Sequence, residues 1–151
     1  MCRRVLDEIE ASHPDRVLRF DSDGDLRGEW DAGRLAQMVS NLVVNAVQHG
    51  DETAPIDVSA RVQDEELTFA VHSQGAAIPQ EDLGNVFEPM VRGESAATTR
   101  KSPEGLGLGL FIVREVATAH GGNVSVSSSQ DEGTTFTVRL PRRPLPDSRS
   151  V

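Results

Sequence analysis

The chain lacks several sequence features that would by themselves assign it to a class of proteins, such as secreted, membrane or nucleic-acid-binding proteins. Its 151 residues include one cysteine, Cys2, so an internal disulfide is impossible and a reducing compartment is expected. No apolar run approaches the roughly 20 residues that cross a bilayer, and the opening MCRRVLDEIEASHPDR lacks the apolar middle of a signal peptide. A net charge of −9 argues against a nucleic-acid surface, which needs a basic patch. We therefore expect a cytoplasmic globular domain.

The apolar spacing predicts a two-layer α/β sandwich, in which three main helices lie on one face of a mixed sheet of about five strands. Asp31 is expected to cap a long helix that ends at Gly50. We expect helices around 5–9 and over 32–49, 79–87 and 110–120, a strand pair over 16–22 and 25–30, a hairpin over 55–63 and 66–73, and closing strands over 123–129 and 134–140. Residues 142–151 look like a disordered tail.

The predicted helix has no Asp, Glu, Lys or Arg between Leu35 and Gly50, although a quarter of the chain is charged. At about 100° per residue, one face of this helix is apolar, and the other gathers amide side chains. These amides are Gln37, Asn41, Asn45 and Gln48. A helix whose neutral polar face meets water or another structural element would account for these amides equally well. The functional interpretation is that Asn41 and Asn45, one turn apart, direct oxygen atoms at a hard cation and its phosphates.

Glycine is concentrated in the run GLGLGL, residues 105–110, just before an apolar helical pattern. Each glycine costs roughly 0.5–1 kcal/mol relative to alanine in regular structure, so the run needs a reason. A small buried strand is one explanation, but the immediate helical spacing of Leu110, Val113 and Ala117 disfavours it. We predict that exposed N–H groups leading into the helix from Leu110 form a cradle for phosphate.

These segments make the chain resemble the ATP-binding domain of bacterial sensor histidine kinases, which shares the Bergerat fold with the gyrase, Hsp90 and MutL ATPases. NLVVNA (41–46) is similar to that family's N box, VFEPM (86–90) to its F box, GLGLGL to its G2 box, and EGTTFTVRLP (132–141) to its closing strand. The boxes occur in the family's order and the resemblance covers 31–141. It implies a start of the domain in 1–30, a core over 31–141 and an ATP lid over about 87–104.

The resemblance also implies the roles of individual residues. Asn45 corresponds to the Mg²⁺ ligand, and Asn41 lies beside it near the phosphates. Arg92 is expected to reach the phosphates from the lid, whereas Lys101 is expected to be an ordinary solvated charge. The implied nucleotide-binding residues are Asn41, Asn45, Gln48, His49, Ser73, Gly75, Ala77, Ile78, Arg92, Gly105, Leu106, Gly107, Leu108, Gly109, Leu110 and Thr134.

The chain departs from the family at four positions. The family's G1 box reads Asp-x-Gly-x-Gly, but here SQGAA replaces the adenine-reading carboxylate with Ser73 and the second glycine with Ala77. Gln48 stands where Lys or Arg is common, and Asp131 occupies a usual glycine position. These changes raise the alternative of a degenerate module that binds nucleotide weakly or binds only partners.

The four histidines are not expected to accept phosphate, because the family's acceptor motif, similar to His-Glu-x-Arg-Thr-Pro, does not occur in the chain. The resemblance therefore implies a catalytic fragment of a histidine protein kinase, inactive alone. It would hold Mg²⁺ and ATP and transfer the γ-phosphoryl group to a separate dimerisation domain, with a response regulator downstream. The fragment would be a monomer and the full kinase a homodimer. A gyrase-like ATPase is disfavoured, because Asn41 stands where those enzymes carry the Glu that activates water, and an amide is no general base.

Overall fold

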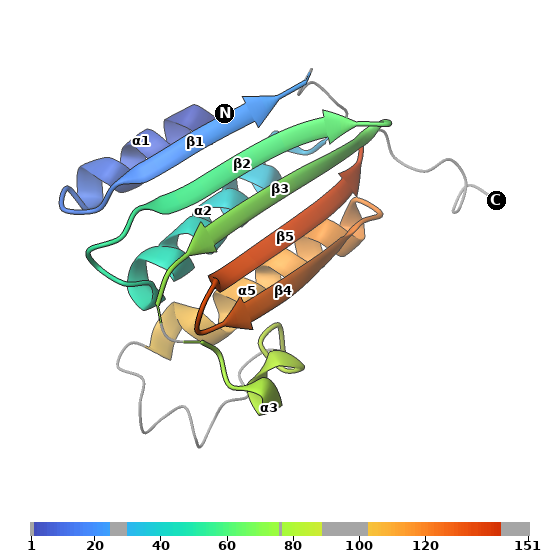
Figure 1. Cartoon of the computed structure of the whole chain (residues 1–151). Coiled ribbons are helices and arrows are strands. Elements are labelled where there is room, and N and C mark those ends of the chain that lie inside the picture. Colours follow the sequence, from blue (N-terminus) through green and yellow to red (C-terminus); the bar gives the residue numbers. More distant parts are fainter. Residues whose placement is uncertain (1, 25–29, 76, 89–102, 143–151) are drawn as a thin grey trace.

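The protein folds into two layers, a five-stranded sheet with helices on one face (Figure 1). The structure is a computed structural model and describes residues 2–24, 30–75, 77–88 and 103–142. The long helices are α1 (Cys2–Ser12), α2 (Ala32–His49) and α5 (Pro103–Ala119), and α3 (Gln80–Leu83) is a single turn. The strands are β1 (Leu18–Asp23), β2 (Ile56–Gln63), β3 (Glu66–Ser73), β4 (Asn123–Ser129) and β5 (Gly133–Pro141). The predicted mixed sheet with three main helices is confirmed.

The strand order is β1-β2-β3-β5-β4, and among the described strands only the β1–β2 pair is parallel. The sequence predicted that β1 would pair with a strand over 25–30. Residues 25–29 lie outside the described residues, so that pairing stays a prediction, and β1 pairs with β2, with Leu18 opposite Ile56. The connection runs through α2, whose apolar face needs a sheet to cover, so a crossover and a parallel pair result.

The helix predicted over 32–49 is confirmed at both ends. The Asp31 carboxylate accepts a hydrogen bond from the Arg34 N–H at 3.1 Å, and the Gly50 N–H makes the last helical bond, to the Ala46 carbonyl at 2.8 Å. Seven buried side chains form its core-facing stripe: Leu35, Met38, Val39, Leu42, Val43, Ala46 and Val47. This stripe packs on the buried side chains of β2 and β3, so the opposite, amide-bearing stripe is left for other contacts.

The predicted hairpin between β2 and β3 is also confirmed, with a two-residue turn. Gln63 pairs with Glu66, and the turn residues Asp64 and Glu65 both have positive φ, 56° and 65°. That conformation gives the twist that a tight hairpin needs, and Asp is among the residues that tolerate it.

The start of α5 differs from the prediction. The sequence indicated a loop over the glycine run and a helix from Leu110, whereas α5 begins at Pro103 and includes Gly105, Gly107 and Gly109. Proline suits the first position of a helix, and Leu106 and Leu108 are strong helix formers between the glycines. These local preferences outweigh the cost of glycine, about 1 kcal/mol per residue.

Far from the glycine run, α2 and α5 are tied together at the opposite end of the domain. The His120 Nδ1 donates to the Val116 carbonyl at 2.8 Å, so its Nε2 is the acceptor for the Asp31 N–H at 3.1 Å. The Trp30 Nε1 donates to the Pro141 carbonyl at 2.9 Å.

Within the described residues, no helix combines the length and the apolar character that crossing a bilayer requires.

Candidate nucleotide-binding site

The predicted site residues gather where α2 ends, β3 ends and β5 begins, beside the first part of α5. Ser73, the last residue of β3, pairs with Thr134 of β5. It is the one buried polar residue among those described, with 9% of its surface exposed. Ser73 and Thr134 therefore lie next to each other on neighbouring strands at this end of the sheet.

A residue that the sequence reasoning missed, Ser128 of β4, joins the strands there. Its hydroxyl lies 2.7 Å from the Thr134 hydroxyl and accepts a hydrogen bond from the Ile78 N–H at 2.9 Å. Ser128 alternates with Val124 and Val126 on the half-buried side of β4. A polar residue at an inward position of a strand was the available signal. Ser128 thus holds the segment after β3 against the β4–β5 hairpin.

Close backbone contact holds the end of α2 against the same segment. The Asp51 N–H donates to the Gln74 carbonyl at 2.7 Å. Gly75 has φ of 141°, and a Cβ there would lie 3.1 Å from the Asp51 nitrogen and 3.4 Å from the Gly50 Cα. A side chain at either glycine would separate α2 from this segment, so the G1-like residues have a structural reason to be small.

The amide face of α2 contacts α5 at Gly109. The Asn41 Nδ2 donates to the Gly109 carbonyl at 3.3 Å, and a Cβ on Gly109 would lie 3.9 Å from the Asn41 side chain. The structure therefore brings together the two halves of the predicted phosphate site, the amide stripe and the glycine run. Asn45 is half-buried one turn further along α2, whereas Gln48 and His49 at its end are exposed.

Several predicted residues are less easily placed in the site. Leu110 is a core residue with 7% exposure, so its side chain packs inward. Arg92 and Lys101, with most of the predicted lid, lie outside the described residues, as do the side chains of Leu106 and Leu108. Because α5 starts at Pro103, which has no N–H, the helical N–H groups that lack an intrahelical partner are those of residues 104 and 105, not those up to Gly109.

The residues present fit a magnesium-bound nucleotide. Within the described ranges, no three His, Cys, Asp or Glu side chains converge as a self-sufficient metal site. Mg²⁺ in nucleotide sites usually takes one or two protein oxygens, with phosphates and waters as its other ligands. The Asn45 amide oxygen can be such a ligand. Asn41 bonds to Gly109 through its side-chain nitrogen, so that bond does not use the Asn41 side-chain oxygen. Buried Ser73, beside Thr134, offers hydroxyl groups to a base.

The carboxylate of Asp51, just after α2, has a lowered pKa because of local hydrogen bonds. The Asp51 carboxylate accepts bonds from the Thr53 N–H and the Thr53 hydroxyl, both at 2.8 Å, and these lower the pKa of Asp51 below 3.8. On the open face of the sheet, the His72 Nε2 lies 2.6 Å from the Glu132 carbonyl and so fixes the tip of the β4–β5 hairpin.

Known proteins share this sequence and this fold. The family model described as histidine kinase-, DNA gyrase B-, and HSP90-like ATPase matches residues 30–144. The signal transduction histidine-protein kinase AfsQ2 of Streptomyces coelicolor is 36% identical over 94% of the chain and 26% of its own length. The sensor histidine kinase WalK of Bacillus subtilis is 33% identical over 91% of the chain and 23% of its own length.

Among solved structures, the catalytic domain of histidine kinase ThkA is similar throughout. The TM-score is 0.78 at 29% identity, covering 95% of this chain and 91% of that one. The chain spans about a quarter of AfsQ2 and WalK but nearly all of the ThkA domain. From the matched residues, the shared fold and these relatives, we conclude that the chain belongs to the histidine kinase-, gyrase B- and HSP90-like ATPase family, as an ATP-binding catalytic domain of the sensor histidine kinase type.

Proposed function

We propose that this domain holds Mg²⁺-ATP between α2 and α5 and presents the γ-phosphoryl group to a histidine on a separate dimerisation domain. The observation that carries the proposal is the contact of the Asn41 amide with the Gly109 backbone. It places the uncharged amide stripe of α2 beside the glycine-containing first half of α5, where the missing side chains let a metal-bound polyphosphate approach. The bound nucleotide supplies the phosphoryl group, and the protein contributes positioning and charge neutralisation.

Each part of the site has its own task. Asn45 provides an oxygen for Mg²⁺, and Asn41 fixes the phosphate side of α5. The unpaired N–H groups in the first turn of α5 favour an anion, as any helix N-terminus does. Ser73 and Thr134 contact the base, and Gly75 lets it approach the backbone.

Transfer to a protein histidine is favoured over hydrolysis. The sequence of α2 contains no Asp or Glu, so the helix that carries the proposed metal ligand offers no carboxylate to activate water. A degenerate module without kinase activity is the second candidate, and the observation in its favour is Ser73 in place of a carboxylate. We infer a cytoplasmic location, a monomeric domain within a dimeric kinase, and a response regulator as the downstream acceptor.

The proposal is tested by replacing the corresponding segment of AfsQ2, the Streptomyces coelicolor kinase with 36% identity to this chain, with residues 1–151. With γ-labelled ATP and Mg²⁺, the chimaera should gain acid-labile phosphate on its dimerisation domain, and the Asn45→Ala chimaera should not. The isolated chain should neither label itself nor hydrolyse ATP quickly. Acid-labile label on any of its four histidines, or rapid phosphate release, would overturn the proposed division of labour.

A further inference from the structure

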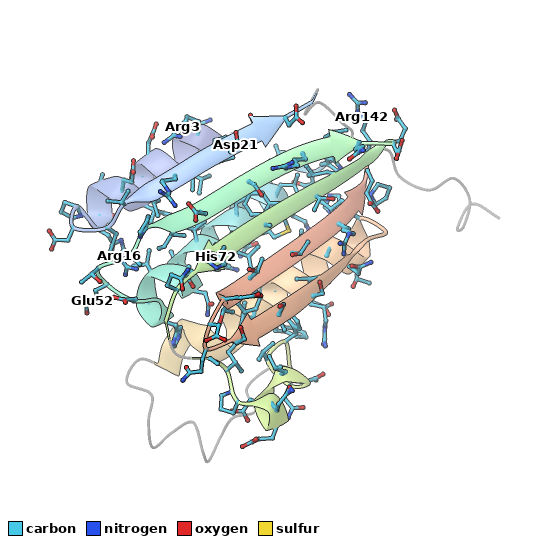
Figure 2. The ribbon with its side chains drawn as sticks, viewed as in Figure 1. Arg3, Arg16, Asp21, Glu52, His72 and Arg142 are labelled. Atoms are coloured by element: carbon cyan, nitrogen blue, oxygen red, sulfur yellow. The ribbon has the colours of Figure 1, made fainter. Side chains whose placement is uncertain are left out.

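Arg16 lies between α1 and β1, before the residues that match the family model, yet its side chain reaches the end of α2. One guanidinium nitrogen donates to the Val47 carbonyl at 2.6 Å, and the other donates to the Asp51 carbonyl at 3.0 Å. Figure 2 shows Arg16 at the end of the sheet that carries Glu52 and His72, away from Arg142. The segment before the family core therefore contacts the site end of the domain.

The Val47 carbonyl needs a partner from outside the helix. The last helical bond runs from the Gly50 N–H to the Ala46 carbonyl, and the Asp51 N–H, which would have bonded Val47, donates to Gln74 instead. Arg16 replaces it, and its charge lies where the helix dipole favours a cation. A guanidinium suits this place because two of its nitrogens reach two carbonyls at once.

Through Asp51, the same contacts lead directly to the segment after β3. Asp51 is held by its carbonyl, which accepts from Arg16 and from the Ala54 N–H at 3.2 Å. It is held by its N–H, which donates to Gln74, and this nitrogen would lie 3.1 Å from a Cβ on Gly75. A shift of Asp51 must therefore shift Gln74 and Gly75, because the backbones are in contact.

The Arg16 side chain also has an unpaired donor. The Nε of Arg16 is buried and has no hydrogen-bond partner within the described residues. Leaving a buried donor unpaired costs stability. An apolar side chain of similar length would avoid that cost but would leave the Val47 carbonyl without the partner that Arg16 provides. The contribution of the arginine is therefore the pair of bonds from its two terminal nitrogens to Val47 and Asp51.

We propose that Arg16 is a positioning residue for the base-binding half of the nucleotide site, acting through Val47 and Asp51 on residues 73–75. The proposal rests on the proposed function for the identity of the ligand. The phosphate half has its own support, the Asn41–Gly109 contact, so Arg16 acts on the base and ribose and not on the metal.

The test compares Arg16→Met with Arg16→Lys and with a control, Arg142→Met, at the other end of the sheet. Arg142 is half-buried like Arg16, and it pairs with the Glu65 carboxylate at 3.4 Å. Calorimetric titrations of the 151-residue chain use ADP with and without Mg²⁺, and adenosine alone. Amide hydrogen exchange at Asp51 and Gly75 is followed by NMR in the same samples.

We expect Arg16→Met to weaken ADP and adenosine by the same factor, about tenfold, the low end of the loss seen when supporting groups behind metal ligands are removed. The effect of Mg²⁺ on ADP affinity should not change. Exchange at Asp51 should quicken, Arg16→Lys should lie between, and Arg142→Met should match the wild type. If Arg16→Met does not fold, Arg16→Lys alone carries the comparison, with a smaller loss in the same direction.

Wild-type affinity for both ligands in the Arg16 variants would overturn the proposal, as would a loss confined to the Mg²⁺ effect. If the wild type binds neither ADP nor adenosine, the proposed function fails, and hydrogen exchange decides the role of Arg16. Faster exchange at Asp51 and Gly75 in Arg16→Met, relative to Arg142→Met, then supports positioning. Equal exchange in the two variants overturns it.

Discussion

Gly133, at the start of β5, gives the sharpest test of how the β4–β5 hairpin meets the site. Its φ is +82°, and a Cβ there would lie 2.4 Å from the Ser73 carbonyl oxygen and 3.0 Å from the His72 Nε2. The left-handed conformation costs a non-glycine residue about 1–2 kcal/mol. The overlap with backbone adds about 1–3 kcal/mol, as other overpacked positions do.

Gly133→Ala should therefore lower the free energy of unfolding by about 2–5 kcal/mol, a large part of the 5–15 kcal/mol of a typical domain. The melting temperature should fall by about 4–20 °C, since each 1 kcal/mol is worth about 2–4 °C at this length. The relief of the overlap must separate β5 from Ser73, so ATP affinity should fall as well.

Urea unfolding measures the stability change, with Gly84→Ala as the matched control. Gly84 has φ of −74°, and nothing lies within 4 Å of the position of its Cβ. That substitution should stay within about 0.5 kcal/mol of the wild type. If Gly133→Ala is as stable as Gly84→Ala, then the hairpin is not packed on Ser73 and the account of this wall of the site is wrong.

Two further predictions concern single carboxylates at the site end. Ser73→Asp should tighten ATP binding several-fold and sharpen its preference over GTP, because hydrogen bonds to a charged partner contribute about 1.5–3 kcal/mol against about 0.5–1.5 for neutral ones; weaker ATP binding in calorimetry would refute this. The pKa of Asp51 is lowered by its bonds to Thr53, so these bonds stabilise the fold fully above pH 3.8 and lose that contribution as the pH falls through the lower, folded-state pKa. Asp51→Asn should therefore reduce the acid sensitivity of the melting temperature below pH 4, and an unchanged pH profile would contradict the assignment.

The elements that could be predicted from the sequence are those with local signals. Asp31 and Gly50 mark the ends of α2 because capping depends on neighbouring residues. The β2–β3 hairpin follows from alternation on both sides of a polar turn. The pairing of β1 with β2 depends on a crossover connection that no local pattern records, and most of the predicted partner strand over 25–30 lies outside the described residues.

The sequence predicted that the amide stripe and the glycine run lie together, and they meet at Asn41 and Gly109. The conformation of the run was not, because glycine spacing suggests a loop while Pro103 and the intervening leucines favour a helix. Ser128 and Arg16 were missed because their roles arise from long-range contacts, to Ile78 and to the end of α2. The binding roles of the individual residues stay predictions.

The central claim, that α2 and α5 hold Mg²⁺-ATP, is tested most directly by calorimetric titration of the wild type and Asn45→Ala with ATP, each with and without Mg²⁺. The wild type should bind one ATP, and Mg²⁺ should tighten the complex. Asn45→Ala should lose the Mg²⁺ effect while keeping its circular dichroism spectrum, because alanine favours the helix and the substitution removes the amide that carries the proposed metal-ligand oxygen. The absence of ATP binding by the wild type, or an undiminished Mg²⁺ effect in Asn45→Ala, would contradict the account.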